Sequence, residues 1–146
     1  MLNSDGGIET DLTVVCIDKN HFRIISSAAT RERDKFHINK HLSKNIELKD
    51  ITDDLCVFGL FGPKSRDLIK TLSEDNFEND EFKFGTAKYI NIEGIKIWAQ
   101  RLSYVGELGY ELYVDLKNTK KIYELLIEKG KDFNLSNCGM HAMDIM

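Results

Sequence analysis

The sequence predicts an α+β fold, with mixed, largely antiparallel sheets and packed helices. Two observations carry this prediction. Short segments rich in β-branched residues are interspersed with helix-like segments, and several of the strand-like segments are joined by turns too short for a helical crossover. With 146 residues, of which 42% are hydrophobic, the chain has the size and composition of one globular domain. We expect residues 1–146 to form a single domain.

The N-terminal third begins with a predicted β-hairpin. Its strands are residues 12–17 and 22–25, which are separated by the polar turn 18–20. Thr30 is expected to cap a helix that continues to about Leu42. Residues 46–51 alternate between apolar and polar side chains, so we expect a strand with one apolar face.

The middle of the chain predicts a strand, a helix and a loop. Residues 55–61 are apolar throughout, which is typical of a strand buried on both faces. Pro63 suits the first turn of the helix that follows, with Leu68, Ile69 and Leu72 facing inward. Residues 73–81 are acidic and lack periodicity, so we expect a solvated loop.

The last third predicts three strands and two helices. The strands are residues 87–92, 95–102 and 110–114, and residues 91–94 form the turn between the first two. Asn118 is expected to cap a helix that ends at Gly130, with Ile122, Leu125 and Leu126 facing inward. Residues 138–146 begin another helix.

Composition excludes several classes of function. The net charge is −4, and no basic face is evident, which argues against nucleic-acid binding. No apolar run approaches the roughly 20 residues that cross a bilayer, and the N-terminus has no secretory signal. The three cysteines form no CxxC pair, so we expect no disulfides and a cytoplasmic location.

A metal site is not predicted. His37 and His41 have the spacing of two ligands on one helix face, but Ile38 stands where zinc hydrolases have glutamate, and no third ligand is evident. A solvated helix face is the preferred interpretation. Gly106 and Gly109 do not complete a phosphate-binding loop.

Residues 6–14 form the first informative motif. The pair Gly6-Gly7 permits close approach of a ligand, and Asp11 begins a strand from which its carboxylate could point into a cleft. The alternative is an ordinary turn with Asp11 on the surface, and this segment alone favours that alternative.

Residues 101–114 form the second motif. Glu111 lies in an otherwise apolar strand, and if it faces inward it must be paired, because an unpaired buried carboxylate is costly. A pterin would fit, since its amino group and adjacent ring N–H present two donors to one carboxylate. A polar strand face that includes Glu111 is at least as consistent with this segment alone.

Together the two motifs resemble the folate-binding domain of the aminomethyltransferase (glycine-cleavage T protein) family. They are more similar still to the C-terminal folate domain of dimethylglycine and sarcosine dehydrogenases. Residues 6–14 match its pattern Gly-Gly-Ile-Glu-x-Asp-Leu-Thr-Val, and residues 103–113 match Ser-Tyr-Val-Gly-Glu-Leu-Gly-(Trp/Tyr)-Glu-Leu-Tyr. Residues 61–66 resemble the start of the family's Gly-Pro-x-Ser-Arg helix.

The resemblance implies a role for each matching residue. Asp11 corresponds to the catalytic acid beside the reactive folate nitrogen. Thr13 and Ile25 fall at folate-contacting positions, Ile25 through its backbone, and Tyr104 matches a tyrosine that lines the folate pocket.

The second motif corresponds to the pterin site. Glu111, with Leu112 and Tyr113 beside it, falls where the family binds the pterin edge. Glu107, which lies in the preceding turn, is expected to have a structural or secondary role.

The function implied is that of a tetrahydrofolate-binding module which transfers a methylene group from an iminium or aminomethyl donor in an amine-demethylating flavoenzyme. FAD would be bound by an oxidase domain preceding this one in the parent chain, since no FAD fingerprint is present here. The alternatives are an aminomethyltransferase of glycine cleavage and a folate-binding module without turnover. The family continues beyond the segment that matches residues 141–144, so we expect a domain incomplete at both termini that is not active alone.

Overall fold

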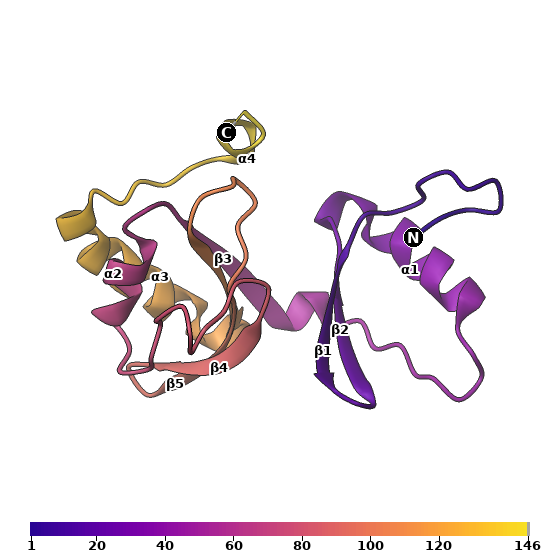
Figure 1. The fold of residues 1–146 in the computed structure, drawn as a ribbon, viewed down its shortest axis with the longest axis horizontal. Coiled ribbons are helices and arrows are strands. Elements are labelled where there is room, and N and C mark those ends of the chain that lie inside the picture. The colour runs from indigo at the N-terminus through magenta and orange to yellow at the C-terminus, as the bar shows by residue number, and fades with distance from the viewer. Residues whose placement is uncertain (146) are drawn as a thin grey trace. The chain divides into compact units, whose positions relative to one another are not determined.

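The computed structural model describes residues 1–145, which divide into two compact units, Met1–Asp50 and Ile51–Met146 (Figure 1). The first unit contains a hairpin and one α-helix, and the second contains a four-stranded sheet and the remaining α-helices. The strands and helices are β1 Thr13–Asp18, β2 His21–Ile25, α1 Arg31–His41, β3 Leu55–Phe61, α2 Ser65–Lys70, β4 Ala87–Ile92, β5 Ile95–Gln100, β6 Gly109–Asp115, α3 Thr119–Gly130 and α4 Met140–Met143.

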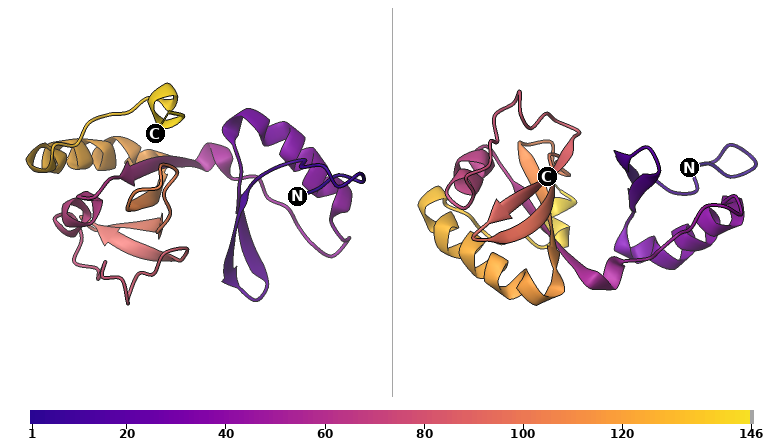
Figure 2. Two further views of the ribbon diagram at one scale, coloured as in Figure 1. Left: turned by 45° about the horizontal axis from the view of Figure 1, so that its top comes forward. Right: turned by 90° about the horizontal axis from the view of Figure 1, so that it is seen from below.

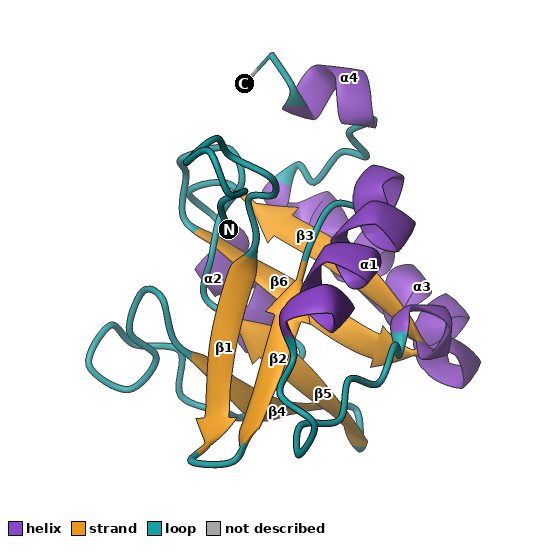
Figure 3. Ribbon diagram, turned by 90° about the vertical axis from the view of Figure 1, so that its right-hand side faces the viewer, coloured by secondary structure: helices purple, strands orange, loops and turns teal. Residues whose placement is uncertain are grey.

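The predicted N-terminal hairpin is confirmed. Strands β1 and β2 pair antiparallel, with Thr13 opposite Ile25 and Val15 opposite Arg23 (Figure 3). The backbone N–H of Asn20 donates to Asp18 Oδ1 at 2.8 Å, which closes the short polar turn.

The predicted helix after Thr30 is also confirmed, but Thr30 acts differently from the expectation. It occupies the N-cap position of α1 without accepting a capping hydrogen bond. Its hydroxyl donates instead to Asp34 Oδ2 at 2.6 Å, with Ser27 O as a second, longer acceptor at 3.2 Å. A buried carboxylate needs hydrogen bonds more than an exposed helix end does, because water can satisfy the helix end.

The prediction of a strand at residues 46–51 is wrong. This segment has no regular structure and no partner strand, and Ile46 is exposed. Its polar side chains hold it instead: Asp50 Oδ2 accepts from Arg31 Nε at 3.0 Å and from Lys35 Nζ at 3.3 Å, both on α1. Alternation alone does not make a strand where no sheet edge is available to pair with it.

The second unit contains an antiparallel sheet with strand order β3-β6-β5-β4, which confirms the predicted fold class. The predicted turn between β4 and β5 is confirmed as well. Glu93 and Gly94 have φ values of 50° and 79°, as required by the tight turns whose twist matches that of paired strands.

Both longer helices of this unit pack on one face of the sheet (Figure 2). The predicted inward-facing residues of α2 and α3 join one apolar core with alternate residues of the strands. Leu125 packs against this core, which consists of Leu60, Leu68, Ile69, Leu72, Phe77, Phe82, Ile90, Ile92, Ile97, Ala99, Tyr110, Leu112, Val114, Ile122 and Leu126.

Strand β3 and the start of α2 differ from the expectations. β3 is an edge strand with one buried face, since Leu60 is buried and Val57 is exposed. Pro63 lies in the turn before α2 rather than in the helix, whose N-cap is Lys64. In that turn the N–H of Ser65 donates to Gly62 O and its hydroxyl donates to Leu108 O, so the chain turns once more before the helix begins.

Residues 73–81 form a loop, as predicted, but the loop is not simply solvated. Phe77 is fully buried, with its ring centroid 5.7 Å from that of Tyr110 in an edge-on arrangement. Phe82, which follows the loop, has its ring centroid 5.7 Å from the same tyrosine. One aromatic side chain therefore anchors a segment that is otherwise acidic.

The C-terminal helices agree with the sequence in position. Gly130 is the last residue of α3, and the left-handed conformation that ends the helical path occurs later, at Asn134 with φ 59°. Asn118 occupies the N-cap position of α3, as predicted, but its side chain makes no capping hydrogen bond. The predicted last helix is α4, and Met146 lies outside the described residues. None of the helices described is long and apolar enough to cross a membrane.

Candidate functional site

The predicted site residues divide between the two units. Asp11, Thr13 and Ile25 lie in residues 1–50, whereas Tyr104 and Glu111 to Tyr113 lie in residues 51–146. Each unit therefore carries its own part of the predicted constellation.

In the first unit, the structure brings Thr13 and Ile25 together as directly opposed residues at the open end of the hairpin. Asp11 is exposed and lies two residues before β1 begins. Its carboxylate is therefore accessible to a ligand. The roles assigned to these residues by resemblance remain predictions.

A buried carboxylate anchors the segment that carries Asp11. Asp34 on α1 is 1% exposed, and the neighbouring Thr10 is 4% exposed. Burial acts to raise the pKa of Asp34, but hydrogen bonds from Thr30, Thr10 and Ser26 outweigh it and hold that pKa below its ordinary value. Sequence reasoning placed Asp34 on a mostly charged helix surface and missed this contact, because only the fold shows which of several acids is buried.

In the second unit, Glu111 and Tyr113 lie on the sheet face opposite the apolar core. Their neighbours in β6, Tyr110, Leu112 and Val114, are all fully buried in that core, and side chains alternate between faces along a strand. The side chain of Leu112 therefore points away from Glu111. A ligand contact by Leu112, as the resemblance implies, would be made through its backbone.

The Glu111 carboxylate is half-buried and partly satisfied. Tyr113 donates its hydroxyl hydrogen to Glu111 Oε2 at 2.6 Å. Among residues 1–145, no lysine, arginine or histidine forms an ion pair with Glu111. The carboxylate therefore keeps acceptor capacity for a further donor.

Gln100, which the sequence reasoning missed, is the cross-strand neighbour of Glu111. It is the last residue of β5 and lies directly opposite Glu111 in the register of the sheet, so the two side chains lie on the same face. Gln100 is 1% exposed, and its Nε2 has no hydrogen-bond partner in the described part of the chain. A polar residue at the end of an apolar strand was a signal that could have been used.

Phe61 forms an apolar wall beside Glu111. Gly59 lies opposite Glu111 on β3, and Gly109 lies opposite Phe61 on β6. A Cβ at Gly59 would come within 2.6 Å of the Phe61 ring, and one at Gly109 within 2.4 Å. The two glycines thus let the ring lie across the sheet next to the carboxylate, where its low polarity strengthens hydrogen bonds. We refer to Phe61, Gln100, Glu111 and Tyr113 as the Glu111 cluster.

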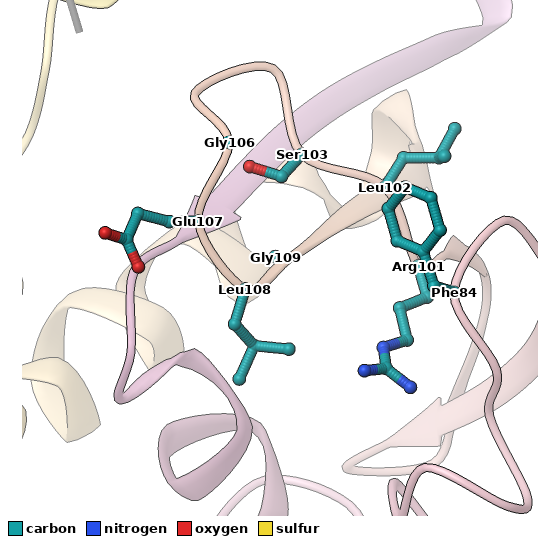
Figure 4. A pocket seen from close by; sticks show the side chains of 8 residues that line it. All are labelled: Phe84, Arg101, Leu102, Ser103, Gly106, Glu107, Leu108 and Gly109. Atoms are coloured by element: carbon teal, nitrogen blue, oxygen red, sulfur yellow. The ribbon is translucent and has the colours of Figure 1, made fainter.

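The turn between β5 and β6 lines a separate cavity of about 260 Å³, shown in Figure 4. Arg101, Ser103 and Glu107 contribute polar groups to it, and Arg101 Nη1 donates to Phe82 O at 2.6 Å. The cavity is smaller than most pockets for drug-sized ligands. Tyr104, in the same turn, is 64% exposed and is not among the lining residues.

The paired histidines of α1 contact each other and the backbone of their own helix. His41 Nδ1 lies 2.8 Å from the carbonyl oxygen of His37, and the two rings are 4.6 Å apart. No group of three or more potential ligands that could hold a metal ion occurs among the residues described.

Comparison with known families matches the whole chain to one of them. The family model described as the GCVT N-terminal domain matches residues 1–146. Dimethylglycine dehydrogenase, mitochondrial, from Homo sapiens is 31% identical over 149 residues, which cover 100% of this chain and 17% of the human protein. An aminomethyltransferase from Caldanaerobacter subterraneus is 27% identical over 147 residues, covering 100% of this chain and 39% of that protein. The chain thus spans less than half the length of these relatives.

A solved structure shares the fold. Heterotetrameric sarcosine oxidase from Corynebacterium sp. U-96, in complex with pyrrole 2-carboxylate, superposes with a TM-score of 0.65 and 15% sequence identity. The match covers 91% of this chain and 66% of the other. It supports the mixed, antiparallel architecture that the sequence predicted.

Proposed function

Because the chain belongs to the GCVT N-terminal domain family, we propose that it is a tetrahydrofolate-binding module of a one-carbon transfer enzyme. Its relatives include a dimethylglycine dehydrogenase, aminomethyltransferases and a 4-methylaminobutanoate oxidase. Each of these names describes an enzyme that acts on a carbon atom attached to an amine nitrogen. The proposal extends that chemistry to this chain.

The Glu111 cluster is the observation that carries the proposal. Glu111 offers a carboxylate with free acceptor capacity and no cationic partner in the described residues, on the sheet face opposite the main apolar core. A pterin presents an amino group and an adjacent ring N–H, which two carboxylate oxygens can accept together. The residues present therefore fit this ligand, and the Phe61 ring supplies an apolar surface beside it.

Tetrahydrofolate would supply a nucleophilic ring nitrogen that bonds to the one-carbon unit of an iminium donor, and the bond from that carbon to the donor nitrogen would break to release the demethylated amine. We assign to Asp11 the role of accepting the proton from that nitrogen or stabilising the positive charge of the donor. Its exposure leaves the carboxylate accessible for either role. The buried contact between Thr10 and Asp34 would fix the backbone from which Asp11 projects.

The parent enzyme is proposed to be an amine-demethylating flavoenzyme, in which an FAD-binding domain outside these residues produces the iminium. Identity to the dimethylglycine dehydrogenase, at 31%, exceeds the 26–29% identity to four bacterial aminomethyltransferases. An aminomethyltransferase of glycine cleavage is the second candidate. The amine donor used with the full-length protein would distinguish the two.

Folate binding by the 146-residue chain tests the proposal. We expect calorimetry with 5-formyltetrahydrofolate, a stable reduced folate, to show saturable binding by the wild-type chain. Glu111→Gln keeps the shape of the side chain but replaces an acceptor oxygen with a donor, so binding should weaken by about 1–3 kcal/mol. The matched control is Glu107→Gln, which changes an exposed carboxylate in the preceding turn and should leave affinity unchanged.

Asp11→Asn separates binding from chemistry. Its affinity for the folate should stay within about threefold of wild type, while methylene transfer by the full-length protein is lost. A folded wild-type chain that binds no reduced folate would overturn the site assignment. Equal weakening by Glu111→Gln and Glu107→Gln would remove Glu111 from the pterin site.

A further inference from the structure

Gln100 is a buried amide whose donor group has no partner. Its side chain is 1% exposed, and Nε2 makes no hydrogen bond to any residue described. Buried amide groups are normally hydrogen-bonded, so each one without a partner calls for an explanation. The register places this amide directly beside Glu111, on the sheet face opposite the main apolar core, where Trp98 and Tyr113 are also buried.

The two side chains present complementary groups in a row. Glu111 accepts hydrogen bonds, and Gln100 has an amide that can donate them. The pyrimidine edge of a 2-amino-4-oxo pteridine carries the complementary groups. In order along this edge they are an amino donor, a ring N–H donor and a carbonyl acceptor. With the two donors on Glu111, the carbonyl oxygen would lie beside the carboxylate, towards one of the two strands that flank β6. The residue opposite Glu111 on β3 is Gly59, which has no side chain, whereas the residue opposite it on β5 is Gln100.

We propose that Gln100 recognises the 4-carbonyl oxygen of the pterin by donating a hydrogen bond from its amide, and that it thereby sets the preference of this site for 4-oxo over 4-amino pteridines. The proposal rests on the proposed function, because it identifies a further contact at the same site. It explains why a glutamine is buried at the end of β5 without a partner within the described residues.

The competing explanation is structural. The amide could rotate to bond Glu111 and serve only to hold the carboxylate in place. In that case the loss of Gln100 would affect every ligand of Glu111 by the same factor. A role in recognising the carbonyl makes the factor depend on the group at position 4. Because the 4-amino ligand also lacks the ring N–H next to that position, each variant is compared with the wild-type chain for the same ligand, so that the altered pairing with Glu111 cancels.

Two variants and two ligands separate these explanations. Gln100→Met keeps the length of the side chain without a donor, and Gln100→Glu offers acceptors only. The ligands are 5-formyltetrahydrofolate and its 4-amino-4-deoxy analogue, titrated against the full 146-residue chain. Lys96→Met is the matched control, because Lys96 lies on the same face of β5 and interacts with the Tyr89 ring at 4.1 Å.

We expect Gln100→Met to weaken binding of the 4-oxo ligand five- to fiftyfold without lowering the melting temperature by more than the control does. Gln100→Glu should reduce the ratio of 4-oxo to 4-amino affinity at least tenfold. An unchanged 4-oxo affinity in Gln100→Met, or equal factors for both ligands in Gln100→Glu, would overturn the inference while leaving the folate site intact. If the wild-type chain binds neither ligand, the proposed function fails and this inference fails with it.

Discussion

The two units of the chain are stabilised in different ways. Residues 51–146 bury a continuous apolar core between one sheet face and two helices. Within the described part of residues 1–50, Ile38 is the one buried apolar side chain. The other two buried side chains there, Thr10 and Asp34, are polar. Ion pairs from Arg31 and Lys35 to Asp50 add to this polar framework.

The difference shows which variables each unit should respond to. Burial of apolar area is insensitive to pH, so the core of the second unit depends on packing. The first unit depends on a carboxylate that must stay ionised to accept its hydrogen bonds. The units should therefore respond separately to a cavity and to acid.

The largest effect should come from Phe77→Ala. Phe77 is fully buried and contacts Tyr110 and Phe82, and truncation of a buried phenylalanine costs about 3–5 kcal/mol. We expect urea denaturation to show this loss and hydrogen exchange to accelerate in β4, β5 and β6.

Phe84→Ala is the matched control, since Phe84 is 74% exposed and follows the same loop. It should change stability by less than about 0.5 kcal/mol. A similar small effect of Phe77→Ala would show that the loop is solvated after all.

A smaller effect should follow from Asp34→Asn. The amide has one acceptor oxygen in place of two and no charge, so it is a poorer acceptor for the hydroxyl of Thr30, which lies 2.6 Å from Oδ2. The first unit should therefore lose about 1–3 kcal/mol. Faster exchange in β1, β2 and α1, with the second unit unchanged, is the expected result.

Glu32→Gln, an exposed change in the same first turn of α1, should leave these exchange rates as they are. If exchange accelerates equally in both units, their stabilities are not separate in the way that the contacts suggest.

The smallest effect concerns pH. The pKa of Asp34 is lowered in the folded chain, so its contribution to stability is full above the ordinary carboxyl pKa of about 4 and is lost as the pH falls towards the lowered value. Hydrogen exchange at several pH values should show the difference between wild type and Asp34→Asn shrinking on acidification. A difference that stays constant or grows as the pH falls would contradict the direction of the shift.

The sequence was most informative about local order. Hydrophobic periodicity located the N-terminal hairpin, the helices and the strands of the second sheet, because alternation and helical spacing report which side of an element is buried. It failed at residues 46–51, where the alternating pattern has no strand to pair with. It also failed to predict that β3 has one exposed face, because an edge strand and a central strand can both be apolar throughout and then have the same sequence pattern.

For the candidate site, the sequence identified Glu111 and Asp11 through their motifs, and the structure added what surrounds them. The placement of Gln100 opposite Glu111 depends on the register of β5 against β6. That register joins residues on either side of a turn whose length the pattern alone did not fix. The Phe61 ring reaches the same face only because glycines stand at positions 59 and 109.

By itself, the sequence determined the order and type of most elements, the antiparallel character of the sheets and the family, since each depends on local pattern or on motifs. Only the tertiary structure decided which polar side chains are buried. Asp34 looks like the exposed acids around it in the sequence, and the place of Gln100 at the end of an apolar strand only hinted at its burial. Burial is a property of the packed chain, and the cost of an unpaired buried polar group arises only once packing has removed water from it.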